Sequence, residues 1–379
     1  MNMGDMNVAL VAITRHGVKL AFRIRERFPG ASCYVPERHK FATAMGAVGF
    51  GRLGEILPQI WKKYDAVVCV MATGIVVRHV APLLVHKATD PAVVVLDERG
   101  HYVISLLSGH LGGANALARE VASVTGGHAV ITTASDVQGR PALDLIAREK
   151  QLEIENFDVL SRFSRAVLED QPFWIFDPYE IISEEFEGLE DAVILQEEPS
   201  GRRDMEKAFC THESCRMVYD SGGSSLVDSS FDPVGVWVSE KIAPRELICV
   251  ALRPRNLVVG LGCNRGTPAG EVLELVESVF DRENLSLFSI RNLVSIDIKA
   301  DEKGLLEVAE CLKRPFHFFS PNDLATVSVP TPSDTVARHV GVQSVCEATA
   351  LLSAKTDTLL VPKEKTANVT LAIARVSYP

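Results

Sequence analysis

Five short runs of aliphatic and β-branched residues recur in the first third of the chain, at residues 8–13, 66–71, 92–96, 102–107 and 129–132. Three stretches between them carry apolar residues at helical spacing, at residues 20–28, 53–63 and 113–124. Strands that are apolar on both faces and alternate with helices are typical of a mainly parallel sheet that is covered on two sides. The pattern therefore predicts an N-terminal α/β domain. A turn at residues 97–100 lies between two adjacent runs and predicts one antiparallel hairpin within this domain.

The pattern changes twice after this region, and a chain of 379 residues exceeds one typical core. Strand-like pieces between residues 143 and 252 are short and irregular, whereas the α/β pattern restarts at Asn256. We therefore predict an α/β domain at residues 1–140, a small α+β domain at 141–254, and a C-terminal α/β domain at 255–379. In the last of these, Ser344 and Glu347 form a capping box that predicts the start of a helix.

Charge is distributed unevenly along the chain. Eleven Asp and Glu residues and no Lys or Arg lie between Leu168 and Ser200, and without them the net charge of −10 would be +1. We interpret this acidic block as a solvated face. The terminal domains are then close to neutral and can hold local basic pockets for anions.

Composition and missing motifs exclude several classes of protein. Hydrophobic residues make up 47% and charged residues 23% of the chain, which is the balance of a globular enzyme. No window approaches the ~20 apolar residues of a membrane span, and the N-terminus lacks the features of a signal peptide. We therefore expect a cytoplasmic protein without membrane partners. The chain also lacks a P-loop, a GxSxG or HExxH motif and stripes of aromatic and basic residues, so nucleic-acid partners are not expected.

The most informative segment is a strand-to-helix junction, Ser108-Gly-His-Leu-Gly-Gly-Ala-Asn115. Unpaired backbone N–H groups at the start of a helix attract anions, and glycines let a ligand approach the backbone closely. His110 is a candidate acid or base, and Ser108 is a candidate hydroxyl donor. A purely structural turn capped by Ser108 would explain the same residues, but a histidine among glycines favours a functional site.

A second junction, Met71-Ala-Thr-Gly-Ile-Val-Val-Arg78, follows the run at residues 66–71. Both junctions should therefore lie at the carboxyl ends of strands, where open α/β sheets bind ligands. Arg78 could pair with a ligand carboxylate or form a surface salt bridge, and the sequence leaves both open.

A third turn, Gly260-Leu-Gly-Cys-Asn-Arg-Gly-Thr-Pro268, has the spacing GxGxxxG after a predicted strand. The acidic residue that a dinucleotide site needs about 20 residues later is not evident, so this match is weak. The turn remains a candidate anion nest with Arg265 as its charge. Elsewhere, Cys210, His212 and Cys215 resemble a metal knuckle, but no second ligand pair follows, and we expect no metal site.

Several segments together resemble the CbiG family of anaerobic cobalamin (vitamin B12) synthesis. In the N-terminal domain they are Met71-Ala-Thr-Gly-Ile-Val-Val-Arg78, Ser108-Gly-His-Leu-Gly-Gly-Ala-Asn115 and Ile131-Thr-Thr-Ala-Ser-Asp136. In the C-terminal domain they are Gly260-Leu-Gly-Cys-Asn-Arg-Gly-Thr267, Glu347-Ala-Thr-Ala-Leu-Leu352, Val361-Pro-Lys-Glu-Lys365 and Asn368-Val-Thr-Leu-Ala-Ile-Ala-Arg375. Their order and spacing agree with the family, while the middle is poorly matched. Asn264 stands where family members often carry a basic residue, and Ser135 where threonine is common.

The resemblance implies a cobalt-precorrin-5A hydrolase. The substrate of such an enzyme is a cobalt-bound, ring-contracted tetrapyrrole with several carboxylates and a δ-lactone. Water opens the lactone, the two-carbon unit leaves as acetaldehyde, and cobalt-precorrin-5B is formed. No cofactor is implied, because the cobalt arrives inside the substrate. The pathway's precorrin methyltransferases are the candidate protein partners.

The resemblance and the turns together give a set of candidate site residues. We assign catalysis to His110 and Ser108, because opening a lactone needs a base for water and donors for the oxyanion. The substrate carboxylates need cationic and N–H anchors. The expected substrate-binding residues are Thr73, Gly74, Arg78, Gly109, Gly112, Gly113, Asn115, Gly262, Cys263, Arg265, Thr267, Glu347, Lys363 and Lys365.

Two other functions stay open on the sequence. A carrier could bind the tetrapyrrole intermediate without catalysis and pass it to a methyltransferase, since a relative of the C-terminal domain occurs as a free-standing protein in the aerobic pathway. An NAD(P)-dependent oxidoreductase could use the turn at residues 260–266, and it would bind a nicotinamide cofactor saturably.

Overall fold

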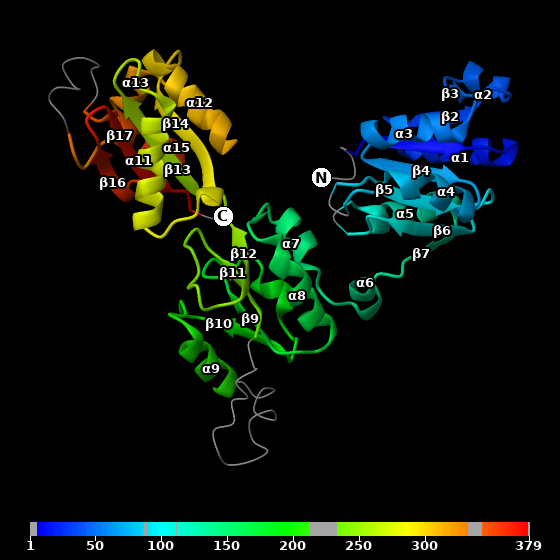
Figure 1. Ribbon diagram of the computed structural model, residues 1–379, viewed down its shortest axis with the longest axis horizontal. Coiled ribbons are helices and arrows are strands. Elements are labelled where there is room, and N and C mark those ends of the chain that lie inside the picture. The colour runs from blue at the N-terminus through cyan, green and yellow to red at the C-terminus, as the bar shows by residue number, and fades with distance from the viewer. Residues whose placement is uncertain (1–5, 87–88, 111, 212–232, 333–342, 378–379) are drawn as a thin grey trace. The chain divides into compact units, whose positions relative to one another are not determined.

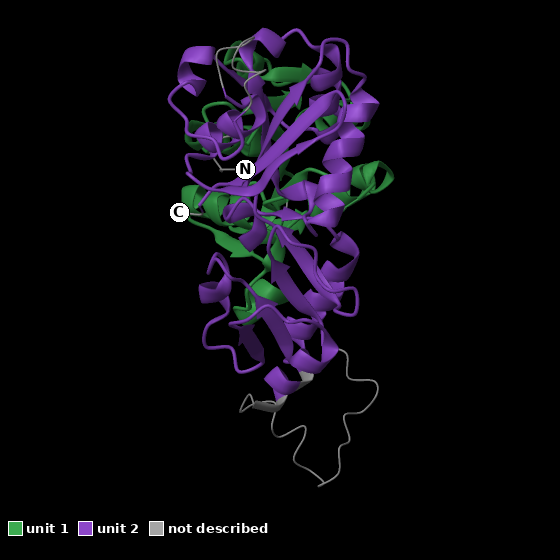
Figure 2. Ribbon diagram, turned by 90° about the vertical axis from the view of Figure 1, so that its left-hand side faces the viewer, with its two compact units in different colours: residues 1–145 green, residues 146–379 purple. Residues whose placement is uncertain are grey.

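The computed structural model describes residues 6–86, 89–110, 112–211, 233–332 and 343–377 (Figure 1). The chain divides into two compact units, residues 1–145 and 146–379 (Figure 2). The first unit holds one sheet, and the second holds two. Each unit is described by itself below.

The first unit is built on a seven-stranded sheet of order β3-β2-β1-β4-β5-β6-β7. Its strands are β1 (Val8–Ala12), β2 (Ser32–Pro36), β3 (Val48–Phe50), β4 (Ala66–Val70), β5 (Ala92–Leu96), β6 (Tyr102–Leu107) and β7 (His128–Val130). Neighbouring strands are parallel except β5 and β6, which form the predicted antiparallel hairpin. Because the chain reverses there, β6 and β7 end at the edge of the sheet where β1, β4 and β5 begin.

Helices cover both faces of this sheet (Figure 1). They are α1 (Arg15–Arg27), α2 (Lys40–Ala44), α3 (Leu53–Lys63), α4 (Thr73–Val80), the 3₁₀ turn η2 (Ala81–Leu83) and α5 (Ala114–Thr125). The short helix α6 (Ala134–Gln138) follows β7, and α7 (Leu143–Glu149) spans the boundary between the two units. In β1, Val8 and Leu10 pack in one buried cluster with α1 and α5, whereas Ala9 and Val11 pack in another with α3 and α4. Alternation along buried strands thus produces the predicted α/β domain with two covered faces.

The middle of the chain forms a five-stranded sheet of order β10-β9-β11-β12-β8. Its elements are β8 (Glu153–Ile154), α8 (Phe157–Leu168), β9 (Phe173–Phe176), the 3₁₀ turn η3 (Ser183–Phe186), β10 (Ala192–Leu195), α9 (Arg202–Thr211), β11 (Gly235–Val238) and β12 (Cys249–Arg253). The pairs are parallel except β12 with β8. Trp174 and Trp237 are fully buried and pack against Met205 and Phe209 of α9. This core is aromatic. Nine of the eleven acidic residues of the block are exposed, as the solvated-face interpretation expects, whereas Asp177 and Asp191 are buried.

The C-terminal sheet has the order β15-β14-β13-β17-β16. Its strands are β13 (Leu257–Cys263), β14 (Ile290–Ile296), β15 (Phe316–Phe319), β16 (Leu359–Lys365) and β17 (Val369–Arg375). Its helices and 3₁₀ turns are α11 (Ala269–Arg282), η4 (Leu287–Ser289), η5 (Asp297–Lys299), α12 (Lys303–Leu312), α13 (Pro321–Leu324) and α15 (Val345–Ala354). Two buried clusters show that α11 and α12 cover one face of the sheet and α15 the other. The fold class predicted for the terminal thirds is therefore confirmed.

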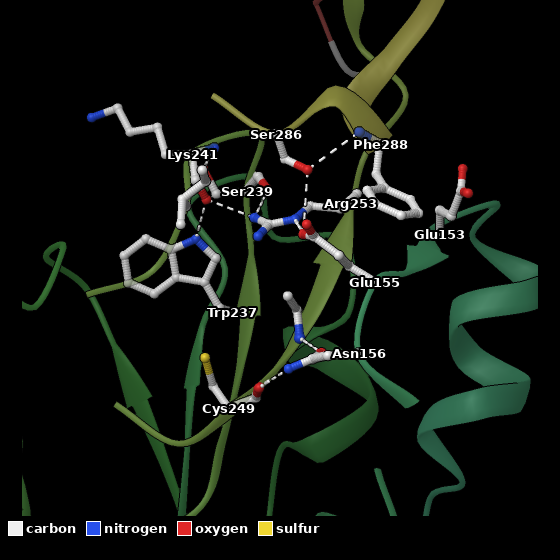
Figure 3. Close-up of polar contacts among 12 residues, drawn as sticks. Glu153, Glu155, Asn156, Trp237, Ser239, Lys241, Cys249, Arg253, Ser286 and Phe288 are labelled. Atoms are coloured by element: carbon white, nitrogen blue, oxygen red, sulfur yellow. Dashed lines mark hydrogen bonds and ion pairs between the residues drawn. The ribbon is translucent and has the colours of Figure 1, made fainter. Parts of the chain in front are cut away.

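A buried arginine joins the middle and C-terminal sheets (Figure 3). Arg253 is 2% exposed and forms an ion pair with Glu155. Its guanidinium also donates to the main-chain oxygens of Ser239 at 2.8 Å and Lys241 at 2.6 Å. From the C-terminal side, Ser286 donates to the same Glu155 carboxylate at 3.2 Å. These contacts explain why residues 146–379 form a single unit.

Candidate functional site

The turn after β6 has a backbone that few residues tolerate. Ser108 has a left-handed φ of +57°, and Gly113 has a φ of +85°. A Cβ on Gly112 would lie 2.3 Å from the Cβ of Ser108, so only glycine fits there. The Ser108 hydroxyl donates to the main-chain oxygen of Asp90 at 3.0 Å. Because this hydroxyl ties the turn to the segment before β5, the structure favours a structural role for Ser108 over the predicted catalytic one.

His110, on the same turn, lies beside a hydroxyl and two carboxylates. Its Nε2 atom is 3.0 Å from Ser135 Oγ and 3.5 Å from Asp136 Oδ2. Its Nδ1 atom is 3.9 Å from Asp144 Oδ1, is buried, and has no hydrogen-bond partner. The side chain as a whole is 20% exposed. A partly exposed imidazole between a hydroxyl and carboxylates is the arrangement that general acid–base catalysis uses.

Asn115, which we predicted to bind substrate, is instead 5% exposed and bonded within the chain. Its amide nitrogen donates to Thr133 Oγ1 at 3.0 Å and to Asp136 Oδ2 at 2.8 Å. Its oxygen accepts from Ser105 Oγ at 2.6 Å. A Cβ on Gly109 would lie 2.8 Å from this oxygen, so a side chain at position 109 would clash with Asn115. Asn115 and Gly109 therefore support the residues around His110 through contacts within the chain.

Ser135, Asp136 and Asp144 were not among the predicted site residues. Ser135 and Asp136 belong to the segment at residues 131–136, which carries part of the family resemblance but contains no turn rich in glycine. The strands β6 and β7 are parallel neighbours, so the segments that follow them meet at one edge of the sheet. That pairing was the missing information, because the sequence does not say which strand lies beside which.

The second predicted junction lies at the opposite edge of the sheet. Val70, the last residue of β4, pairs with Leu96 at the end of β5, whereas Leu107 at the end of β6 pairs with Val93 near the start of β5. Both turns therefore lie at the carboxyl ends of their strands, as predicted, but at opposite edges of the sheet. The physical reason is the reversal of the chain at the hairpin.

A pocket of about 510 Å³ lies at this second edge, where β1, β4 and β5 end. Most of its lining is apolar, and Thr73 and the pair Asp97 and Glu98 contribute polar atoms. The strand order reverses between β1 and β4, which is where open α/β sheets bind ligands. Gly74 has open space around its Cα, and Arg78 is exposed farther along α4. Of the three residues predicted here, the structure places Thr73 in the pocket wall.

The predicted anion nest in the C-terminal domain is occupied by the chain's own carboxylates. The amide of Gly266 donates to Glu302 Oε1 at 2.8 Å. Arg265 forms ion pairs with Asp301 and, at 3.6 Å, with Glu302. Thr267 is buried, and its hydroxyl donates to the main-chain oxygen of Asn264 at 2.9 Å. A substrate carboxylate would have to displace these groups, so the structure contradicts an open nest.

The first two glycines of the GxGxxxG motif serve packing. A Cβ on Gly260 would lie 1.9 Å from the main-chain oxygen of Cys346, because α15 packs directly on β13. A Cβ on Gly262 would lie 2.6 Å from Thr370 Oγ1. Cys263, the next residue, is half-buried, and burial raises the pKa of its thiol. Close packing thus explains Gly260 and Gly262, and Gly266 has a left-handed φ of +74°, so the motif needs no dinucleotide to account for it.

Glu347 is fully buried and cannot touch a substrate, in contrast to our prediction. Its carboxylate accepts from the amide and the hydroxyl of Thr331 and from the amide of Lys363. The Lys363 ammonium donates to the main-chain oxygen of Thr331 at 2.7 Å, so it is also engaged within the chain. Ser344 occupies the N-cap position of α15 without a side-chain capping bond, and the predicted capping box is therefore wrong. Lys365 is exposed at the end of β16.

The described residues hold no cluster of three or more His, Cys, Asp or Glu side chains arranged for a metal ion. They also contain no helix that is long and apolar enough to cross a membrane. His212 and Cys215 of the metal-knuckle motif lie outside the described residues.

Three family models match successive parts of the chain. They are described as cobalamin synthesis G N-terminal, at residues 55–136, cobalamin biosynthesis central region, at 141–254, and cobalamin synthesis G C-terminus, at 257–374. The chain belongs to the CbiG family. The site around His110, up to Asp136, lies within the N-terminal match.

Relatives of this CbiG chain extend over its full length. It is 34% identical to a cobalt-precorrin-5A hydrolase of Priestia megaterium, over 98% of the chain and 95% of the relative. It is 31% identical to a cobalt-precorrin-5A hydrolase of Salmonella typhimurium, over 97% of the chain and 98% of the relative. A shorter match, 33% identical over 31% of the chain and 79% of the relative, is to protein CobE of a Sinorhizobium species.

Proposed function

We propose that this protein is a cobalt-precorrin-5A hydrolase of cobalamin synthesis. Support comes from two relatives of that name, each aligned over nearly all of both chains. The single structural observation that carries the proposal is the imidazole of His110. His110 lies in the turn after β6, is partly exposed, and is within hydrogen-bond distance of the Ser135 hydroxyl. Hydrolysis of an ester needs such a base, because water or another hydroxyl must lose its proton as it attacks the carbonyl.

The reaction that we propose starts with opening of the δ-lactone. His110 accepts the proton of the attacking group and returns it to the departing oxygen, which becomes a free hydroxyl. Loss of the proton from that hydroxyl then releases the two-carbon unit as acetaldehyde. The protein needs no cofactor of its own for these steps, since the cobalt belongs to the substrate. Among the predicted anchors for substrate carboxylates, Arg78 and Lys365 are exposed cations, but Arg78 follows the opposite edge of the sheet from His110.

The direct experiment incubates the purified protein with cobalt-precorrin-5A, follows the corrinoid by mass spectrometry and traps acetaldehyde. The variant His110→Ala should lower kcat by about 10²–10⁴-fold, which is the usual contribution of a positioned acid or base. His128→Ala is the matched control, because His128 is exposed at the start of β7, remote in sequence from the turn. Unchanged kcat with a raised KM in His110→Ala would make His110 a binding residue and place the base elsewhere.

A carrier function is the second candidate, and the match of the C-terminal region to CobE favours it. A carrier would bind the intermediate without releasing acetaldehyde and would pass it to a precorrin methyltransferase. The same incubation separates the two functions. Retention of unchanged cobalt-precorrin-5A on the protein, without acetaldehyde, would support the carrier and contradict the hydrolase.

A further inference from the structure

We infer that Ser135 is the nucleophile that opens the lactone, with His110 as its base and Asp144 as the residue that orients the imidazole. The inference rests on the proposed hydrolase function and goes beyond it, because it assigns the attacking atom. A nucleophile and its base are recognised by a hydrogen bond between them and by a third group that fixes the base. The hydrogen bond is present at His110, and the carboxylate of Asp144 lies near enough to the ring to serve as the third group.

The two ring nitrogens of His110 differ in what they can reach. The Nδ1 atom is buried and has no hydrogen-bond partner, so a water molecule cannot be activated there. The Nε2 atom is the available base, and the group that faces it at 3.0 Å is the Ser135 hydroxyl. A water molecule could use Nε2 only after displacing that hydroxyl. The geometry therefore directs the proton transfer to Ser135.

The carboxylate of Asp144 lies on the other side of the ring. Its Oδ1 atom is 3.9 Å from Nδ1, and a small inward movement would bring it within hydrogen-bond distance. A proton on Nδ1 facing this carboxylate leaves the lone pair of Nε2 toward Ser135, which is the tautomer that a base requires. Asp144 acts through His110, so it is a positioning residue.

Asp136 is a poorer partner for the ring, although its Oδ2 atom is 3.5 Å from Nε2. Its two oxygens already accept hydrogen bonds from Asn115 at 2.8 Å and from Arg119 at 2.6 Å. These bonds fix the start of α6, which carries Ser135 as well. Asp136 therefore places the nucleophile and does not share its proton.

The other serines near the turn are already engaged. Ser108 Oγ donates to the main-chain oxygen of Asp90, and Ser105 Oγ donates to Asn115. Ser135 is half-buried and so is reachable from solvent, and its hydroxyl contacts the imidazole. It is the one serine of these three whose hydroxyl meets a base.

The covalent steps balance with water as the only co-reactant. Ser135 Oγ forms a bond to the lactone carbonyl carbon while its proton passes to His110 Nε2. The ring C–O bond then breaks, and the departing oxygen takes that proton and becomes the free hydroxyl. Water attacks the acyl-serine, gives a proton to the same nitrogen, and releases the carboxylic acid as Ser135 regains its proton.

The first test compares kcat of wild type, Ser135→Ala, Ser135→Thr and His110→Ala. Ser135→Ala should lower kcat at least ~10²-fold, whereas Ser135→Thr keeps a hydroxyl and should retain measurable turnover. The double variant of Ser135→Ala and His110→Ala should be no slower than the slower single variant, because the two residues act as one unit. Ser123→Ala is the control, since Ser123 is exposed on α5 and contacts the main chain of its own helix. Thermal melts establish that each variant is folded.

The second test detects the covalent bond and does not depend on turnover alone. Acid quenching during the reaction, followed by intact-protein and peptide mass spectrometry, should find the corrinoid acyl group on Ser135. A fluorophosphonate probe, which needs no tetrapyrrole, should label Ser135 in wild type and fail to label it in His110→Ala.

The outcomes separate this inference from the proposed function. If wild type releases acetaldehyde and Ser135→Ala turns over at the wild-type rate while His110→Ala does not, His110 activates water directly. The inference is then overturned and the hydrolase function stands. If wild type leaves cobalt-precorrin-5A unchanged and the probe does not label Ser135, both are wrong.

Discussion

The turn after β6 places His110 through two residues that tolerate unusual geometry. A left-handed φ costs a residue other than glycine about 1–2 kcal/mol, and at Ser108 the hydrogen bond to Asp90 offsets part of that cost. Gly112 lies against Ser108 with no space for a side chain. The position of the imidazole therefore depends on a contact within the turn, between Gly112 and Ser108, and on a hydrogen bond to Asp90, 18 positions away.

Gly112→Ala tests this dependence at the residue scale. The new methyl group would lie 2.3 Å from Ser108 Cβ and 2.7 Å from the Ser108 main-chain oxygen, so the turn must open. We expect a loss of about 1–3 kcal/mol in unfolding free energy, as for other overpacked sites, together with a lower kcat. Urea unfolding and acetaldehyde release measure the two effects. Gly30→Ala, where a Cβ would meet nothing within 4 Å, should change neither.

Among the elements, α15 and β16 are held together by one buried carboxylate. Glu347 lies in the first turn of α15 and accepts hydrogen bonds from Lys363 of β16 and from Thr331. An ionised group that is fully buried is tolerated when it accepts several hydrogen bonds. The carboxylate thus joins the helix to both the strand and the segment at Thr331.

Removing the Glu347 carboxylate should destabilise the C-terminal domain. Glu347→Ala leaves three partly buried donors without this acceptor, and we expect a loss of about 2 kcal/mol in unfolding free energy. Glu277→Ala is the matched control, because Glu277 is exposed on α11. Denaturation followed by intrinsic fluorescence and far-ultraviolet circular dichroism measures both variants. Equal stability of the Glu347→Ala and Glu277→Ala variants would contradict the role of Glu347 in joining α15 to β16.

At the scale of the whole second unit, a buried carboxylate again joins two sheets. Glu240 is 2% exposed and accepts hydrogen bonds from Tyr179, from Asn256 at 3.2 Å and from Arg375 at 2.9 Å. Burial opposes its ionisation, but the hydrogen bonds from Tyr179, Asn256 and Arg375 hold the pKa of Glu240 below its usual value. The junction therefore depends on a charged Glu240.

This lowered pKa predicts how the junction responds to acid. The contribution of Glu240 to stability is fully present above the unfolded pKa of about 4.3 and is lost as the pH falls through the lower folded pKa. Glu240→Gln removes that contribution, so its melting temperature should lie below that of wild type near pH 7. The difference should shrink as the pH falls to about 3. A difference that stays constant with pH would contradict the role of the charge.

The sequence by itself determined the local structure of this protein. Apolar periodicity and turn chemistry depend on residues that are close in the chain, and they correctly indicated the α/β class of the terminal domains and the hairpin at Asp97. They also indicated the glycine turn that carries His110.

The tertiary structure decided which of these local features meet. Ser135 approaches His110 because β7 pairs with β6, and the two residues are 25 positions apart. Glu302 occupies the expected anion nest by accepting from Gly266, 36 positions away in the chain. Glu347 is buried and accepts from Thr331, 16 positions away. Pairing, register and burial are set by the free energy of the whole packed core, whereas a turn or a helix start is set by its own few residues.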